Sequence, residues 1–244
     1  MSGIYKDILK AKSQGEKLLA VLIDPDKMPV TKVESFIRDI NTTVATHIFV
    51  GGSEVVPGQT QRIVAEIKKY TILPIVLFPG DVTQICESAE AILFLSLISG
   101  RNPDYLIEKH VEAVSKLRNS DLEVIPTGYL LIENGKVTSV QKVTGTLPMS
   151  RSDISKIADT AKAGELLGMQ LIYLEAGSGA THPVTEEIIS AVKKDLNIPL
   201  IVGGGIRELN GIETAYASGA DMVVIGTAFE EDDSFFEALK RIYN

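Results

Sequence analysis

Short apolar runs alternate with longer amphipathic stretches along the whole chain. Eight of these runs have the continuous hydrophobicity that is typical of buried strands in a parallel sheet. The last three recur about 25 residues apart, which is the length of one strand–helix unit. The predicted strands are Leu18–Ile23, His47–Val50, Pro74–Phe78, Ala91–Leu95, Glu123–Ile132, Leu171–Leu174, Leu200–Val202 and Met222–Ile225.

Stretches with helical periodicity lie between most of the predicted strands, and a first one would close the floor of the fold. This alternation favours a single α/β domain over residues 1–244, a (β/α)₈ barrel of the TIM type. The length of 244 residues is close to the roughly 250 typical of such barrels, and an open doubly wound sheet is the alternative. The predicted helices are Ser2–Lys12, Val30–Ile40, Pro57–Lys69, Pro103–Leu117 and Ser152–Leu167.

Two segments depart from the alternation. Pro79–Glu90 is too short for a crossover helix with its loops, so we expect a shortened or missing helix and a gap in the outer ring between strands three and four. In Tyr129–Val140, alternating residues flank Asn134-Gly135, a dipeptide that favours a tight hairpin turn. This pattern predicts a hairpin that extends the fifth strand above the barrel mouth, either as part of a lid or as an insertion without a role.

Composition limits the partners and the location. The chain is 45% hydrophobic and has a net charge of −8 without a lysine–arginine block, which argues against nucleic acid and against electrostatic docking on an anionic membrane. The single cysteine, Cys86, cannot form an internal disulfide, and no apolar stretch reaches the roughly 20 residues needed to span a bilayer. We therefore expect a cytoplasmic protein without a transmembrane segment.

Three glycine-bearing turns follow predicted strands in the C-terminal half, at Tyr173–Gly179, Val202–Ile206 and Ile225–Thr227. Glycine lets a backbone approach a ligand closely, and the N–H groups at the start of a following helix favour an anion. One such turn could simply be a tight loop. Three in consecutive units match the phosphate site that barrels build after strands seven and eight, so the sequence predicts a phosphate ligand.

Active-site residues of such barrels lie at the carboxyl ends of the strands, and this rule selects three polar residues. Asp24 follows the first strand and is either a hard oxygen ligand suited to Mg²⁺ or a turn-capping residue. Ser53 could add a hydroxyl to a metal shell or cap the next segment. Glu175, beside the first glycine turn in a partly dry setting, is the candidate general base. The three histidines lack ligand spacing, so no zinc site is expected.

These motifs together resemble the geranylgeranylglyceryl phosphate synthase family, along the whole chain. The resemblance implies a prenyltransferase that joins sn-glycerol 1-phosphate to geranylgeranyl diphosphate or a similar polyprenyl diphosphate, in ether phospholipid biosynthesis, with Mg²⁺ as cofactor. It also implies a homo-oligomer that contacts the membrane peripherally to release its product. The motifs that carry it are Asp24-Pro25-Asp26-Lys27, Gly51-Gly52-Ser53, the string Tyr173–Gly179, Gly203-Gly204-Gly205 and Gly226-Thr227.

The resemblance also implies roles for individual residues. Asp24 and Ser53 would bind Mg²⁺, and Glu175 would deprotonate the glycerol hydroxyl. Many members carry a basic residue two positions before the metal aspartate, where this chain has Leu22, and Lys27 is not assumed to replace it. The residues that would hold glycerol phosphate are Tyr173, Leu174, Glu175, Ala176, Gly177, Ser178, Gly179, Gly203, Gly204, Gly205, Gly226 and Thr227.

A prenyl tail needs a dry groove, and the gap at Pro79–Glu90 is the expected place for it. Its apolar wall would include residues of strands two to four, such as Ile48, Val50, Val76 and Phe78. Two other interpretations stay open. One is a phosphosugar isomerase or aldolase, which requires a second acid–base residue or a Schiff-base lysine at a strand end. The other is a non-catalytic barrel that binds a phosphorylated metabolite.

Overall fold

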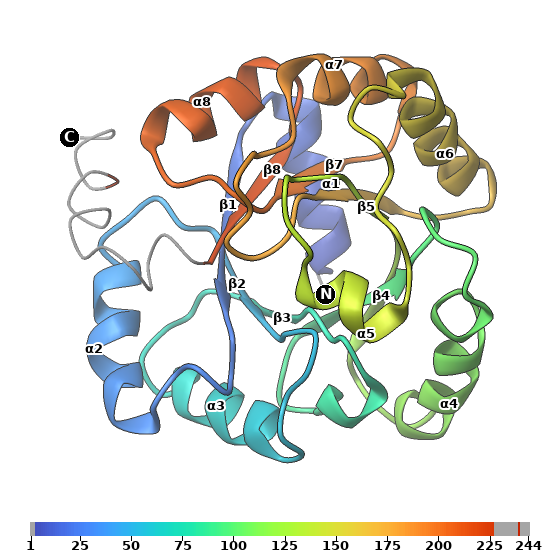
Figure 1. Ribbon diagram of the computed structural model, residues 1–244. Coiled ribbons are helices and arrows are strands. Elements are labelled where there is room, and N and C mark those ends of the chain that lie inside the picture. The colour runs from blue at the N-terminus through green and yellow to red at the C-terminus, as the bar shows by residue number, and fades with distance from the viewer. Residues whose placement is uncertain (1–2, 227–238, 240–244) are drawn as a thin grey trace.

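Eight parallel strands form a closed barrel in chain order. The computed structural model describes residues 3–226 and Leu239. Strand β8 pairs with β1 and closes the ring, which confirms the (β/α)₈ barrel and excludes the open sheet. Figure 1 shows the helices as a ring around the strands. The strands are β1 (Leu18–Ile23), β2 (His47–Val50), β3 (Ile75–Leu77), β4 (Ala91–Ser96), β5 (Glu123–Leu131), β6 (Leu171–Glu175), β7 (Leu200–Gly203) and β8 (Met222–Ile225).

Successive strand residues point alternately into the barrel and towards the helices, because side chains alternate along a strand. Phe49 and Tyr173 belong to the inner buried cluster, whereas Ile48, Val50 and Leu174 belong to the outer one. All of these side chains are at most 1% exposed. The barrel therefore has a packed interior and a second apolar layer beneath the helices.

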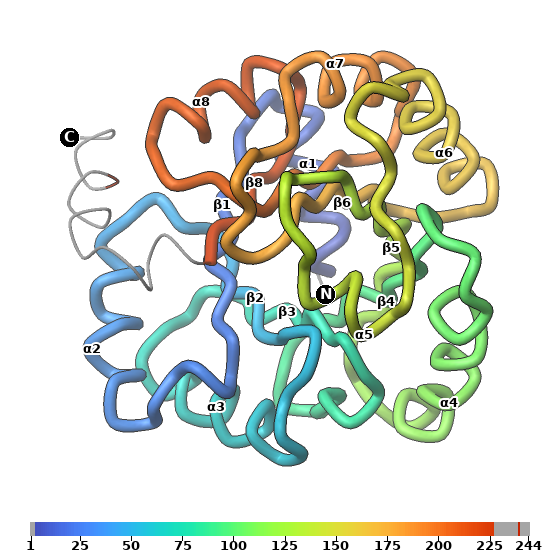
Figure 2. Tube along the Cα trace, in the orientation of Figure 1, coloured from blue at the N-terminus to red at the C-terminus, as the bar shows by residue number. Residues whose placement is uncertain are grey.

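The first helix, α1 (Ile4–Gln14), closes the amino-terminal end of the barrel. Its buried residues Ile8 and Ala11 pack with the inner cluster rather than with the outer helices. Figure 2 shows α1 behind the strands, on the side away from α5. The predicted floor is thereby confirmed.

The remaining helices surround the strands, and local sequence signals set their ends. For example, the Thr185 side chain accepts the Ile188 N–H at the start of α7, and glutamates in the first turn and lysines in the last turn complement the helix dipole. They are α2 (Val30–Ile40), α3 (Gln59–Ile67), α4 (Glu108–Leu117), α5 (Ser139–Thr144), α6 (Ile154–Leu166), α7 (Glu186–Asp195) and α8 (Leu209–Ala217).

The connection between β3 and β4 contains only one 3₁₀ turn, η1 (Val82–Gln84). The Asp81 side chain caps this turn by accepting the Thr83 N–H. The predicted gap in the helical ring is therefore confirmed, and it lies between α3 and α4 in Figure 1. The helix predicted over Pro103–Leu117 is divided into a 3₁₀ turn, η2 (Pro103–Tyr105), and α4.

The predicted hairpin at Tyr129–Val140 is wrong. The chain leaves β5 after Leu131, and Ile132 forms a parallel bridge with Met149. Asn134-Gly135 does form a tight turn, with Gly135 at φ +90°. Its polar groups bond to the segment after β6 instead of to a returning strand, and the chain continues into α5, which lies in front of the barrel mouth in Figure 1.

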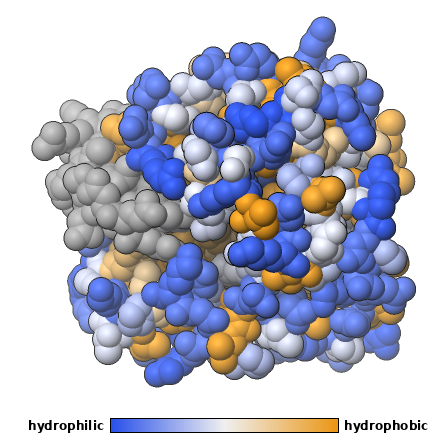
Figure 3. Space-filling model, viewed as in Figure 1, coloured by the Kyte–Doolittle hydropathy of each residue, from blue (hydrophilic) through white to orange (hydrophobic). Residues whose placement is uncertain are grey.

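Within the described residues, no helix combines the length and the apolar composition needed to cross a bilayer. The surface facing the viewer in Figure 3 is mostly hydrophilic, with apolar residues in small separate groups.

Candidate active site

A polar cavity lies at the carboxyl ends of the strands. It gathers most of the residues that the sequence predicted for a site, although they come from strand ends far apart in the chain. Strand register explains this gathering, since Glu175 at the end of β6 pairs with Gly203 at the end of β7. The predicted residues that line the cavity are Asp24, Ser53, Tyr173, Glu175, Gly177, Ser178, Gly179, Gly204, Gly205 and Gly226.

Three predicted residues of the described chain are absent from the cavity wall. The side chains of Leu174 and Ala176 are fully buried in the outer layer, so they can offer only backbone groups to a ligand. Gly203 is the last residue of β7 and lies behind the side chains of Tyr173 and Glu175. Thr227 lies outside the described residues.

Glu175 is a buried carboxylate held against the glycine turns. It is 6% exposed, and its carboxylate accepts the N–H of Gly177. A β-carbon on Gly204 would overlap Oε1 of this carboxylate, and one on Gly203 would lie 3.1 Å from Oε2. Gly204 also has φ +83°, a conformation that favours glycine. The glycine triplet therefore leaves room for the carboxylate as well as forming the turn.

Burial sets the protonation of this carboxylate. It raises the pKa of Glu175 from 4.5 to about 7, against a smaller lowering by the Gly177 N–H and by the nearby Tyr173 hydroxyl. A carboxyl with a pKa near 7 can accept a proton at neutral pH and is basic enough to make that transfer favourable. This is the property required of a general base.

Two buried tyrosines stand beside Glu175. Burial and the Glu175 charge raise the pKa of both Tyr129 and Tyr173 well above 10, so both phenols stay protonated. The Tyr173 hydroxyl is close to the Glu175 carboxylate, but it makes no hydrogen bond of ordinary geometry within the described chain. Its ring stacks on Phe78 at 5.1 Å between centroids. A buried donor without a partner, facing a cavity, is suited to a polar ligand group.

The raised pKa of Glu175 predicts pH-dependent stability. Because the folded pKa of about 7 exceeds the ordinary 4.5, this group's contribution is fully present below pH 4.5 and is lost as pH rises through 7. Relative to Glu175→Gln, the wild type should lose roughly 2–3 kcal/mol of unfolding free energy between pH 5 and pH 8. Urea denaturation of both proteins at the two pH values measures this, and parallel pH dependences would show that the carboxyl is not perturbed.

Asp24 directly follows β1 and faces the cavity with a side chain that is 24% exposed. Its Oδ1 accepts the Asp26 N–H at 3.1 Å, and its Oδ2 lies 3.7 Å from Lys27 Nζ. Asp26 points elsewhere and accepts the Val56 N–H, so it holds the loop after β2. The carboxylate of Asp24 thus caps its own turn and remains accessible from the cavity.

The donor set suits Mg²⁺ bound together with a substrate. Mg²⁺ usually keeps several waters and takes one or two carboxylates plus substrate phosphates, which Asp24 with the hydroxyl of Ser53 can satisfy. Among residues 3–226 no cluster of three metal-ligating side chains occurs, so this part of the chain has no all-protein metal cage. Asp24 and Ser53 therefore fit a substrate-assisted magnesium site.

Several residues of the cavity wall were not predicted from the sequence. Arg207 follows the glycine triplet closely, and its Nη1 donates to the Ala180 carbonyl at 3.0 Å. A cation immediately after Gly-Gly-Gly-Ile was a readable signal for an anion site. Lys27 also lines the cavity, beside Asp24. Thr138 and Ser139 come from the segment wrongly predicted as a hairpin, so no sequence pattern placed them here.

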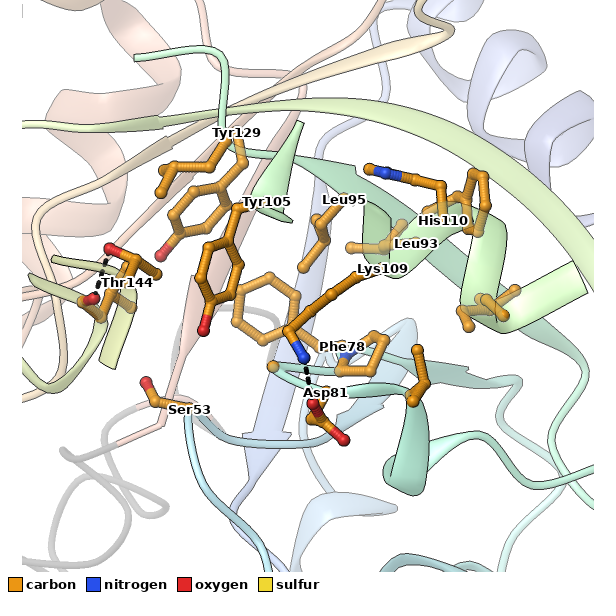
Figure 4. Close-up of a pocket in the computed structure, with 18 of the residues that line it drawn as sticks. Ser53, Phe78, Asp81, Leu93, Leu95, Tyr105, Lys109, His110, Tyr129 and Thr144 are labelled. Carbon is orange, nitrogen blue, oxygen red and sulfur yellow. Dashed lines mark hydrogen bonds and ion pairs between the residues drawn. The ribbon is translucent and has the colours of Figure 1, made fainter. Parts of the chain in front are cut away.

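An apolar groove adjoins the polar cavity at the gap in the helical ring. Figure 4 shows its wall, in which side chains of β4 and η2–α4 face the segment after β3. An ion pair of 2.5 Å between Lys109 and Asp81 joins α4 to that segment. The groove and the cavity share Gly52, Ser53, Phe78, Tyr129 and Val140 as wall residues. Other groove residues are Leu93, Leu95, Leu97, Tyr105, His110 and Ala113.

The groove lies where the sequence placed it, but its predicted wall was mostly wrong. Phe78 lines it, whereas Ile48 and Val50 point outward into the helix layer and Val76 points into the barrel. The predicted contribution of strand four is confirmed, whereas no residue of β2 lines the groove and α4, whose contribution was not predicted, forms part of its wall. Side chains alternate along a strand, so Ile48, Val50 and Val76 point away from the groove, and α4 provides part of the wall instead.

The fold and the site together define a class, a TIM-barrel enzyme with a buried carboxylate between glycine turns and an adjoining apolar groove. A model of the PcrB family matches residues 8–243. The chain is 53% identical to the geranylgeranylglyceryl phosphate synthase of Flavobacterium johnsoniae over 98% of both chains. It is 38% identical to that of Pyrococcus furiosus, over 98% of this chain and 95% of the other.

Solved structures agree with the sequence relatives. The (S)-3-O-geranylgeranylglyceryl phosphate synthase of Thermoplasma acidophilum, in complex with its substrate sn-glycerol-1-phosphate, has a TM-score of 0.92 and 32% identity over 98% of this chain and 96% of that chain. The thiamine phosphate pyrophosphorylase of Pyrococcus furiosus, at 13% identity and a TM-score of 0.57, shares the fold alone. The chain therefore belongs to the PcrB family, with the geranylgeranylglyceryl phosphate synthases, and is an enzyme of the prenyltransferase class.

Proposed function

We propose that this chain forms an ether bond between sn-glycerol 1-phosphate and geranylgeranyl diphosphate or a similar polyprenyl diphosphate, and that it releases diphosphate in a Mg²⁺-dependent reaction. One observation carries the proposal, namely that a polar cavity with a buried carboxylate adjoins an apolar groove. This pair of sites suits one small phosphorylated substrate and one with a long hydrocarbon tail. The names of the relatives and the glycerol phosphate bound to the Thermoplasma enzyme support the same assignment.

The glycine turns would hold the phosphate of the glycerol substrate. Gly177, Gly204 and Gly205 lie on the cavity wall with positive φ, which brings backbone N–H groups close to a ligand. Arg207 adds a charge beside them. Fixing the phosphate holds the free hydroxyl near Glu175, so that the reaction does not depend on a chance encounter.

Glu175 would then accept the proton of that hydroxyl. The glycerol oxygen attacks the first carbon of the prenyl group, the allylic carbon–oxygen bond breaks, and diphosphate leaves with the bonding electrons. Mg²⁺ held by Asp24 and Ser53 would neutralise the negative charge that develops on the departing diphosphate. Tyr173, protonated and without a hydrogen-bond partner in the described chain, would donate to an oxygen of the substrate.

The prenyl tail would lie in the groove between η1 and α4. Burial contributes roughly 0.8 kcal/mol per CH₂, so a C20 tail could supply much of the binding free energy. The Asp81–Lys109 ion pair would lie over the tail and connect the two walls of the groove.

The aldolase alternative has no support in the cavity. A Schiff-base lysine must be desolvated to lose its proton near neutral pH. Lys27 lines the cavity, but its side chain is 52% exposed and lies in an ion pair with Asp24.

Hydrogen exchange tests where each substrate binds. A non-hydrolysable prenyl diphosphate should slow exchange in residues 79–90 and along α4, because the tail would fix the segment that closes the groove. Glycerol phosphate alone should instead protect the turns around Gly177, Gly204 and Gly226. If the prenyl ligand protects only the glycine turns, the tail lies elsewhere and the assignment of the groove is wrong.

A further inference from the structure

The loop between β5 and α5 is tied to the first glycine turn by a buried asparagine. Asn134 is 1% exposed, and its Nδ2 donates to the carbonyl of Ala176. Its Oδ1 accepts the N–H of Lys136 at 2.9 Å, and its own carbonyl accepts the N–H of His182 at 3.2 Å. The bonds to Ala176 and His182 fix the loop against the segment that follows β6, and the bond to Lys136 shapes the loop itself.

Gly135 lets the loop turn back over that segment. It has φ +90°, and a β-carbon there would lie 3.1 Å from the His182 ring. Further along, the Thr138 methyl group occupies the space that a β-carbon on Gly177 would need. The loop therefore packs directly on the turn assigned to glycerol phosphate.

The same packing brings a lysine onto this turn. Nζ of Lys136 lies 2.9 Å from the position that a β-carbon on Gly179 would take. No residue of the described chain forms an ion pair with Lys136. The absence of a side chain at Gly179 leaves the ammonium directly against the backbone of the turn.

The charge balance of the cavity favours another cation at this place. The ionisable side chains on its wall comprise three carboxylates and two cations, which are Asp24, Glu54, Glu175, Lys27 and Arg207. A phosphate monoester adds close to two negative charges at neutral pH. Lys27 is paired with Asp24 after β1, whereas Glu175 ends β6, so Arg207 alone would not balance a phosphate bound next to ionised Glu175.

We propose that Lys136 is a further substrate-binding residue, which contacts the phosphate of sn-glycerol 1-phosphate from the loop above Gly179. The proposal rests on the function assigned above and adds to it a residue outside the barrel strands and their glycine turns. Asn134 acts as the positioning residue, because its bonds to Lys136 and Ala176 join the lysine to the turn.

Calorimetric titration of sn-glycerol 1-phosphate into Lys136→Met tests the proposal. We expect the Kd to rise about tenfold, the lower end for a charge-assisted hydrogen bond, because the lysine is exposed. Lys136→Arg should stay within about threefold of the wild type, since it keeps the charge. Lys142→Met, which removes a lysine from α5 in the same connection, is the matched control and should bind as the wild type does.

The outcomes separate the two proposals. If the wild type binds sn-glycerol 1-phosphate and Lys136→Met binds it equally well, only the role of Lys136 is rejected. If Lys142→Met weakens binding as much as Lys136→Met, the effect is general surface charge and the role is also rejected. A wild type that binds no sn-glycerol 1-phosphate, but binds a prenyl diphosphate, would overturn the proposed function together with the role of Lys136.

Discussion

Glu175→Gln is expected to lower kcat by at least about 100-fold while leaving the Kd for sn-glycerol 1-phosphate nearly unchanged. Glutamine keeps the shape of the side chain but cannot accept a proton from the glycerol hydroxyl. Glu175 is buried between Gly177 and Gly204, so a glutamine should occupy the same place without opening the site. Steady-state kinetics and calorimetric titration of the variant measure the two quantities separately.

The pH profile adds an independent check on this residue. Because the pKa of Glu175 is raised to about 7, kcat/KM of the wild type should increase with pH through about 7, as the base loses its proton. The variant should lose this rise. Glu186→Gln, an exposed carboxylate in the first turn of α7, is the matched control and should keep wild-type kinetics. Turnover at the wild-type rate by Glu175→Gln would remove this residue from the mechanism.

Asp24→Asn should abolish most of the Mg²⁺-dependent activity, with a loss of roughly 100-fold or more at saturating substrate, and leave the fold intact. The amide has nearly the same shape and can still accept the Asp26 N–H, so the turn after β1 should survive. It lacks the negative charge that a hard cation requires.

A metal titration shows whether Asp24 binds Mg²⁺ or only caps the turn after β1. In Asp24→Asn, the Mg²⁺ concentration needed for half-maximal activity should rise. Mn²⁺ binding in the presence of substrate, followed by electron paramagnetic resonance, should weaken. Asp26→Asn is the control, since Asp26 holds the Val56 N–H and faces away from the cavity. If Asp24→Asn keeps its metal affinity and rate, Asp24 is only a turn residue.

The barrel could be predicted from the sequence because its strands are continuous apolar runs. Leu18–Ile23, His47–Val50 and Met222–Ile225 match the observed strands at both ends. Such runs bury both faces, so their limits coincide with the first polar or glycine residue. The absence of a helix at Pro79–Glu90 followed from chain length alone.

The site was predictable only in part. Strand ends meet at one edge in a parallel barrel, so the order of the strands along the chain is enough to place Asp24, Ser53 and Glu175 around the same opening. Whether a given strand residue faces inward depends on register, and the expected groove wall failed for this reason at Ile48 and Val50.

The loop after β5 was mispredicted as a hairpin for a different reason. Asn134-Gly135 has the composition of a hairpin turn, but the carbonyl of Ala176 and the N–H of His182 compete for its polar groups. These partners lie far away in sequence, beyond the range of local turn preferences. The proximity of Lys136 to Gly179 depends on these long-range bonds of Asn134 and could therefore not be predicted from the sequence.

Product analysis shows directly whether the two adjoining sites join a glycerol phosphate to a prenyl diphosphate. The purified protein would be incubated with radiolabelled sn-glycerol 1-phosphate, Mg²⁺ and prenyl diphosphates of several lengths, with sn-glycerol 3-phosphate and EDTA as controls. We expect a labelled, organic-soluble prenyl ether and an equal amount of diphosphate, both dependent on Mg²⁺ and on Glu175. Contradiction would come from a protein that binds both substrates yet forms no ether with any chain length.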